Sequence, residues 1–169
     1  MSRVVSTKAI TVKSFLRKKK RGEKIVVLTA YDALFARLQD EAGVDCILVG
    51  DSVGMVLGGR PDTLSVTVDE MIYHTANASR GVKRALLVMD MPFLSTQKGE
   101  HEALCVCGRA LAEGHAHAVK IEGGKHMAAT IAHLVTKGIP VMGHIGLTPQ
   151  SIHQLGGWGT QGKTKNAAE

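Results

Sequence analysis

Short apolar runs alternate along the chain with longer segments in which apolar residues recur every three or four positions. The runs are rich in β-branched and aliphatic residues, as in strands buried on both faces, and lie at 23–30, 44–50, 84–92, 116–122 and 139–146. The longer segments predict amphipathic helices over 31–42, 67–79, 97–113 and 125–137. Five alternations of strand and helix predict a parallel sheet.

Local signals support these helices. In the first of them, Leu34, Leu38 and Ala42 fall on one apolar stripe, and Gly43 follows as the residue that ends the helix. Thr67 with Glu70 three residues later forms a capping box, which predicts the start of the next helix.

The fold class follows from where the polar residues stand. Right-handed crossovers bring the carboxyl ends of all parallel strands to one rim, and polar side chains close four of the predicted strands. This pattern predicts a (β/α)₈ TIM barrel with about five of its βα units present. A flavodoxin-like open sheet is the alternative, since five strands suit it, but it gathers its ligands at one switch point.

Composition narrows the class of protein. With 169 residues, 44% of them hydrophobic and 21% charged, the chain is long enough for one globular domain, assigned to residues 1–169. No run approaches the ~18 apolar residues of a membrane span, and the beginning of the chain does not resemble a signal peptide. Three cysteines indicate free thiols in a reducing compartment, so a cytoplasmic protein without a membrane partner is expected.

The formal charge of +6 raises the question of a polyanionic partner. Five positive residues lie in the run 17–21, which closes a short helical pattern, where cations complement the helix dipole. A solvated helix end is therefore favoured over a polyanion site. Because the chain has only six aromatic residues, stacking on RNA bases is not supported, and no nucleic-acid partner is expected.

Three acids at predicted strand ends indicate a metal site. Asp51, Asp90 and Glu122 offer only oxygen ligands, which suits Mg²⁺ and disfavours zinc. A cation held by few carboxylates keeps positions open for the ketone and carboxylate oxygens of a 2-oxo acid. Taken singly, an aspartate such as Asp90 is more often a turn former, so the prediction depends on the acids lying together.

Three further polar residues extend the site. Lys120 is suited to neutralise enolate charge, and His144 to hydrogen-bond a substrate oxygen; alone, they would be a rim lysine and a core histidine. Ser52 is suited to bind a carboxylate by its hydroxyl or its N–H. The loop 58–66 hangs from the same strand end and is a candidate lid.

A competing metal motif is Cys105-x-Cys107 followed by His115-x-His117. Helical residues two apart point about 200° from each other, so the two cysteines cannot chelate one ion together. Cys46 reads as a core residue.

Several motifs, in the same order and at the same spacing, closely resemble the ketopantoate hydroxymethyltransferase family. The resemblance extends from the basic helix to about Lys163, and its motifs are highly specific. They are Leu48-Val49-Gly50-Asp51-Ser52-Val53-Gly54-Met55-Val56-Leu57, Thr67-Val68 with Tyr73-His74-Thr75, Asp90-Met91-Pro92-Phe93, Val119-Lys120-Ile121-Glu122-Gly123-Gly124 and Gly143-His144-Ile145-Gly146-Leu147-Thr148-Pro149-Gln150-Ser151.

The resemblance implies a TIM barrel of the phosphoenolpyruvate/pyruvate superfamily and a cytoplasmic homodecamer of pantothenate biosynthesis. It implies Mg²⁺-assisted enolisation and aldol-type transfer of a hydroxymethyl group from 5,10-methylenetetrahydrofolate to α-ketoisovalerate, giving ketopantoate. By position, the resemblance assigns the metal to Asp51, Asp90 and Glu122. It assigns substrate binding to Ser52, Asp90, Lys120 and His144.

The chain departs from the family in length. A (β/α)₈ barrel needs ~250 residues, so the domain is expected to be truncated at its C-terminal side. No residue here matches the family's general base, a glutamate on a later strand. The alternatives are therefore a non-catalytic remnant that binds metal and keto acid, or another Mg²⁺-dependent 2-oxo acid lyase or mutase of the superfamily. The first and fifth strands are expected to be open edges, and solubility to be poor.

Overall fold

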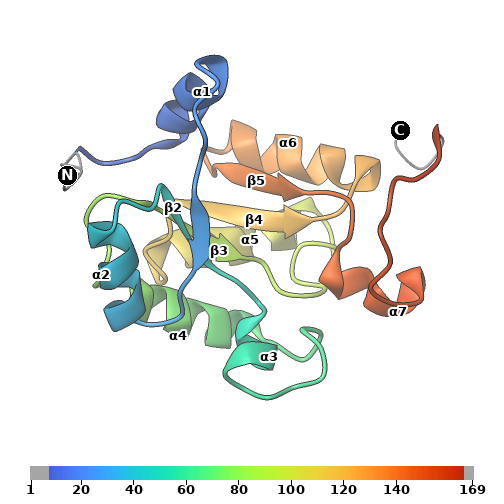
Figure 1. Ribbon diagram of the computed structural model, residues 1–169. Coiled ribbons are helices and arrows are strands. Elements are labelled where there is room, and N and C mark those ends of the chain that lie inside the picture. The colour runs from blue at the N-terminus through green and yellow to red at the C-terminus, as the bar shows by residue number, and fades with distance from the viewer. Residues whose placement is uncertain (1–7, 166–169) are drawn as a thin grey trace.

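The computed structural model describes residues 8–165 and contains one sheet of five parallel strands (Figure 1). The strands are β1 (Val27–Thr29), β2 (Cys46–Val49), β3 (Leu86–Asp90), β4 (Ala118–Glu122) and β5 (Val141–His144). They are ordered β1-β2-β3-β4-β5, as in the chain. This order confirms the barrel-type arrangement and excludes the flavodoxin-like sheet, in which the strand order is permuted.

Helices connect successive strands, and α2, α4, α5 and α6 all contact the sheet. The helices are α1 (Val12–Lys20), α2 (Ala33–Glu41), α3 (Val53–Val56), α4 (Val68–Ser79), α5 (Glu100–Ala112), η1 (Lys125–Met127), α6 (Ala128–Thr136), η2 (Pro149–Ser151) and α7 (Ile152–Leu155). Sequence reasoning did not predict α3. Among the described residues, no helix is both long and apolar enough to cross a membrane.

The two faces of the sheet are buried in separate clusters. Ile47, Leu87 and Val119 point to the side of the helices and pack in the main core. Cys46 and Leu86, one position earlier on β2 and β3, point to the other side and form a smaller inner cluster. Because side chains alternate along a strand, the inner face also receives Asp90, Lys120 and Glu122 at the ends of β3 and β4.

The first strand differs from the prediction of a long buried strand. It covers only three residues, all exposed, with Val27 41% and Leu28 46% accessible. The reason is that β1 pairs on one side only, with β2, while its other edge carries no strand within residues 8–165. Strand β5 likewise pairs on one side only within residues 8–165, as was expected for the first and fifth strands of this stretch.

Helix α2 also departs from the prediction. Its apolar stripe is not the buried face, because Leu34 and Leu38 are 53% and 52% accessible while Ala36 is fully buried. The buried face lies against α4, where a Cβ on Gly81 would stand only 2.2 Å from the carbonyl oxygen of Ala33. Periodicity located the helix correctly, but it could not say which face had a partner.

Candidate active site

All six side chains predicted from the sequence line one pocket of about 320 Å³ at the carboxyl ends of the strands. They are Asp51, Ser52, Asp90, Lys120, Glu122 and His144. The three acids and Lys120 are at most 8% exposed, while Ser52 and His144 are half-buried. The strands thus gather these polar groups, as the strand-end argument predicted.

Strand register explains the closest contacts. Asp90 on β3 is the register partner of Lys120 on β4, and their Oδ1 and Nζ atoms lie 2.8 Å apart. Glu122, two residues further on β4, is the register partner of His144 on β5. Its Oε1 atom lies 3.1 Å from Nδ1 of His144 and 3.8 Å from Nζ of Lys120.

The imidazole of His144 stands between a donor and an acceptor. Its Nδ1 atom is 3.2 Å from Nζ of Lys120 and 3.1 Å from Oε1 of Glu122. A single ring nitrogen either accepts from the ammonium or donates to the carboxylate. The tautomer of His144 therefore selects which of the two neighbours is held and which is left available to a ligand.

Burial disfavours the ionised forms of Asp51 and Asp90. Burial raises the pKa of Asp51, and the nearby charge of Glu122 adds to this, against the hydrogen bond from Gln150. Burial also raises the pKa of Asp90 to about 7, although the charge of Lys120 opposes it. Both acids therefore lack sufficient positive charge from the protein itself.

The donor set fits a hard divalent cation. With all three acids ionised, the pocket holds three negative charges against the single positive charge of Lys120. The three acids offer only oxygen atoms as ligands. Within residues 8–165, no group of three or more His, Cys, Asp or Glu side chains is arranged so that it could hold a metal ion, so a cation here would have at most two of the acids as direct ligands. This arrangement fits Mg²⁺, which often takes only one or two carboxylates and completes its shell with water and substrate oxygens.

Ser52 is held from behind by Tyr31. The two hydroxyl groups lie 2.9 Å apart, and the backbone carbonyl of Tyr31 in turn contacts Nδ1 of His74 at 2.9 Å. Tyr31 is 9% exposed, so this contact between the two hydroxyl groups is largely shielded from solvent. The orientation of the Ser52 hydroxyl is thereby fixed by the first strand and by α4.

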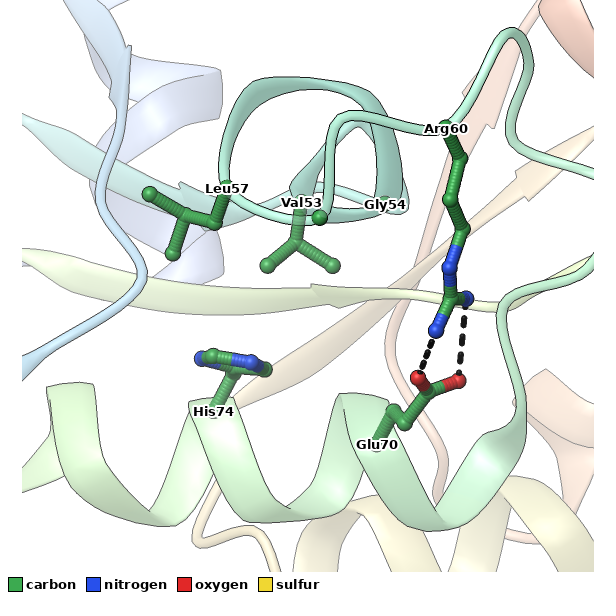
Figure 2. Close-up of a pocket in the computed structure, with 7 residues that line it drawn as sticks. Val53, Gly54, Leu57, Arg60, Glu70 and His74 are labelled. Carbon is green, nitrogen blue, oxygen red and sulfur yellow. Dashed lines mark hydrogen bonds and ion pairs between the residues drawn. The ribbon is translucent and has the colours of Figure 1, made fainter.

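The predicted lid loop is anchored on α4, as Figure 2 shows. The guanidinium of Arg60 reaches the carboxylate of Glu70 through both of its terminal nitrogens. The hydrogen bond from Arg60 and that from the N–H of Thr67 lower the pKa of Glu70 to about 2. The predicted capping box is confirmed by the reciprocal hydrogen bonds between Thr67 and Glu70.

This anchoring brings a loop residue into the active-site pocket. Thr63 lines the pocket and is 2% exposed. The loop packs closely on α3, since a Cβ on Gly54 would lie 2.5 Å from Cγ2 of Val66. A separate pocket of about 250 Å³ lies between α3 and α4 and is the one that Figure 2 shows; none of the six predicted residues lines it. The loop thus forms part of the wall of the active site, and its role as a lid stays a prediction.

One important residue was missed by sequence reasoning. The side-chain nitrogen of Gln150 donates to Oδ2 of Asp51 and to the carbonyl of Met91, both at 2.8 Å. Its backbone N–H donates to Oε2 of Glu122 at 3.0 Å. A glutamine carries no charge to draw attention, but its place one residue after Thr148-Pro149, on the loop leaving β5, was a usable signal.

The competing cysteine motif is separated as expected. Cys105 is exposed and Cys107 is buried, so the two lie on different faces of α5, and Cys46 is buried in the inner cluster. The sulfur of Cys105 instead lies 3.9 Å from Nε2 of His101, one helical turn earlier.

Solved structures with a similar fold support the barrel assignment. A 2,3-dimethylmalate lyase, a member of the PEP mutase/isocitrate lyase superfamily, superposes with a TM-score of 0.59 at 18% identity, over 84% of this chain and 53% of its own. A phosphonopyruvate hydrolase in complex with oxalate and Mg²⁺ gives 0.64 at 16% identity, over 79% and 52%. At this identity the likeness establishes the fold, of which the chain provides five strands.

Sequence relatives are more specific. A 3-methyl-2-oxobutanoate hydroxymethyltransferase of Magnetococcus marinus is 54% identical over 96% of this chain, and one of Trichlorobacter lovleyi is 54% identical over 95%. The chain spans about 60% of the length of these curated relatives. A model of the ketopantoate hydroxymethyltransferase family matches residues 9–169. The chain therefore belongs to the ketopantoate hydroxymethyltransferase family.

Proposed function

We propose that this chain supplies the metal-binding and keto-acid-binding part of an enzyme that makes ketopantoate in pantothenate biosynthesis. The reaction is transfer of a hydroxymethyl group from 5,10-methylenetetrahydrofolate to α-ketoisovalerate. The observation that carries the proposal is the gathering of six polar side chains from four strand ends in one pocket, in a chain of this family. As in the family, assembly with further copies in the cytoplasm is part of the proposal.

In this proposal Asp51 and Asp90 hold the cation and Glu122 reaches it through water. Bound Mg²⁺ would polarise the ketone of the substrate and so acidify the neighbouring C–H bond. Glu122 is the least suited to bind directly, because one of its oxygens accepts from the N–H of Gln150 and the other faces His144.

The remaining residues handle the substrate. Lys120, whose ammonium group lies between Asp90 and Glu122, offsets the negative charge that develops on the enolate oxygen. In the Nε2–H tautomer, His144 accepts from Lys120 through Nδ1, releases Glu122 and can donate from Nε2 to a substrate oxygen; in the Nδ1–H tautomer it holds Glu122. Ser52, held by the hydroxyl of Tyr31, binds the substrate carboxylate from the end of β2.

Mg²⁺-dependent binding of α-ketoisovalerate, followed by saturation-transfer NMR, tests this function. We expect binding with Mg²⁺, loss of binding with EDTA, and weakening by at least about tenfold in Lys120→Gln, because a charge-assisted contact is removed. Lys98→Gln is the matched control, since Lys98 is exposed, pairs with the exposed Glu102 and does not line the pocket. Binding that is indifferent to Mg²⁺, or absent, would contradict the proposal.

Two further readouts refine the assignment. Deuterium exchange at C3 of bound α-ketoisovalerate, above the rate with Mg²⁺ alone, would place a working base within this chain. Binding without exchange would place the base on another segment. Equal competition by 2,3-dimethylmalate would favour a lyase of the same superfamily over the hydroxymethyltransferase.

A further inference from the structure

Gln150 joins three strand ends that the active site needs to keep in register. It lies in the middle of η2 and is 6% exposed. Through its side chain it contacts Asp51 after β2 and the carbonyl of Met91 after β3, and through its backbone it contacts Glu122 at the end of β4. The first of these contacts spans 99 positions of the sequence.

The local structure makes both donors available. The first N–H groups of a helical turn have no partner within the turn, and proline at the first position of η2 leaves Gln150 as the first donor. Its side-chain amide uses both hydrogens, one for each oxygen acceptor at 2.8 Å. The reverse orientation of the amide would set its oxygen against two acceptors, so the observed one is strongly preferred.

These bonds determine which carboxylate oxygens face the pocket. Oδ2 of Asp51 accepts from Gln150, which makes Oδ1 the more available oxygen for a ligand. Burial raises the pKa of Asp51, and the nearby hydroxyl of Thr63, like Gln150, acts against this rise. Oε2 of Glu122 is occupied by the N–H of Gln150, and Oε1 faces His144. Without Gln150, the carboxylate of Asp51 would be free to rotate and to present either oxygen.

We propose that Gln150 is a positioning residue for the cation site, which holds Asp51 so that it binds a divalent cation through Oδ1 alone. This inference depends on the metal site of the proposed function. Residues behind metal ligands typically change metal affinity by about 10- to 100-fold. Gln150 differs from a merely structural residue because its partners are the acids of the pocket.

Binding of Mn²⁺ alone to the protein that carries this chain, measured by electron paramagnetic resonance, tests the proposal. In Gln150→Met, which keeps the side-chain length and removes the donor, we expect the Kd for Mn²⁺ to rise at least about tenfold. The spectrum of the bound ion at saturation should also change, because Asp51 is no longer fixed. Gln154→Met is the matched control, four residues later and exposed, and should leave both readings unchanged.

A second variant protects the test against a folding defect. Gln150→Asn keeps an amide and the backbone donor, but its side chain is shorter by about 1.5 Å and cannot reach Asp51. We expect the same loss of Mn²⁺ affinity, with circular dichroism and the unfolding temperature of the metal-free protein close to the original.

The outcomes are distinguishable. If the unmodified protein binds Mn²⁺ and both folded variants bind it within twofold, with the same spectrum, Gln150 is structural only and this inference is wrong. If both variants lose their secondary structure, Gln150 supports the fold and the inference is again wrong. If the unmodified protein fails to bind Mn²⁺, the metal site of the proposed function is rejected and this inference falls with it.

Discussion

Strand β2 has a buried aspartate beyond each of its ends, and the two carboxylates meet opposite surroundings. Asp45, before the strand, is 5% exposed, and Asp51, after it, is 3% exposed. Burial alone would raise the pKa of Asp45, but the hydrogen bonds from Lys18 and from the N–H of Val26 outweigh it and lower the pKa. At Asp51, burial prevails and the pKa is raised.

The difference lies in the partners that the fold provides. At the amino ends of the strands, Oδ1 of Asp45 is 2.6 Å from Nζ of Lys18, and Oδ2 accepts from Val26 at 3.0 Å. At the carboxyl ends, three acids share one lysine. Strand β2 is thus flanked by Asp45, whose charge the protein balances by itself, and by Asp51, which has too little positive charge around it. Acids of the second kind are typical of functional sites.

The largest expected effect concerns the unsatisfied acid. Asp51→Asn keeps the shape but removes the charge, so we expect the Kd for Mg²⁺ or Mn²⁺ to rise by more than about 100-fold, beyond the loss for residues behind a ligand. The metal-free variant should be no less stable than the original, because a buried charge has gone. Titration calorimetry and urea unfolding measure the two quantities. If metal-free Asp51→Asn were much less stable than the original, Asp51 would resemble Asp45 in stabilising the fold, and the prediction would be wrong.

For Asp45, whose carboxylate has partners within the protein, we expect a loss of stability without a loss of metal affinity. Asp45→Asn places an amide against the ammonium of Lys18 and the N–H of Val26, both of which need an acceptor. Losing hydrogen bonds to a charged group should cost about 2 kcal/mol of unfolding free energy, observable in urea. Affinity for Mn²⁺ should stay within about twofold, and a tenfold change would show that the two ends of β2 are coupled.

The pH dependence of stability should have opposite signs for Asp90, at the carboxyl ends of the strands, and for Asp45, at their amino ends. Since the folded pKa of Asp90, about 7, exceeds the reference value of 3.8, the folded state binds the extra proton between these values. The stability that this residue gives the metal-free protein is therefore fully present below pH 3.8 and is lost progressively as pH rises from there to about 7. For Asp45, whose pKa is lowered, stability is present above pH about 4 and lost below it.

Asp90→Asn isolates the first of these contributions, because asparagine mimics the protonated acid at every pH. The stability of the variant relative to the original should rise between pH 5 and pH 8 by at least about 1 kcal/mol, the equivalent of one pKa unit. Urea unfolding in EDTA measures this difference. A relative stability that stays constant with pH would mean that Lys120 alone balances Asp90.

The smallest effect is expected at an acid that is neither buried nor functional. Asp69 is 81% exposed and pairs with Arg109 at 2.9 Å. Exposed pairs contribute about 0–1 kcal/mol, so Asp69→Asn should shift stability by less than about 0.5 kcal/mol, and less at high salt. Thermal unfolding at low and high ionic strength checks this. A larger effect would show that burial is not what separates the other aspartates.

Much of the fold and of the candidate site was predictable because both depend on local patterns. The apolar runs 84–92 and 116–122 located β3 and β4, and the polar residues Asp90 and Glu122 in these runs located side chains of the pocket. Parallel strands then required these residues to converge, whatever the details of the loops.

The remainder depends on contacts between distant segments. Whether Leu34 or Ala36 is buried on α2 depends on which neighbours are present, and periodicity does not carry this information. Helix α3 was missed because Gly54 within it and Gly58 after it are poor helix formers. A Cβ on Gly54 would lie 2.5 Å from Cγ2 of Val66, and one on Gly58 would lie 2.6 Å from the carbonyl oxygen of Gly54. The role of Gln150 arises only when β2, β3 and β4 are already aligned.

The order of the strands has a consequence for how the chain assembles during synthesis. Because each strand pairs with the one that precedes it, a new strand finds its partner already made when it leaves the ribosome. The sheet can therefore grow in one direction, from β1 towards β5, without waiting for residues still to be translated. The polar residues described here come together late in this sequence, since His144 and Gln150 arrive only after the four earlier strands.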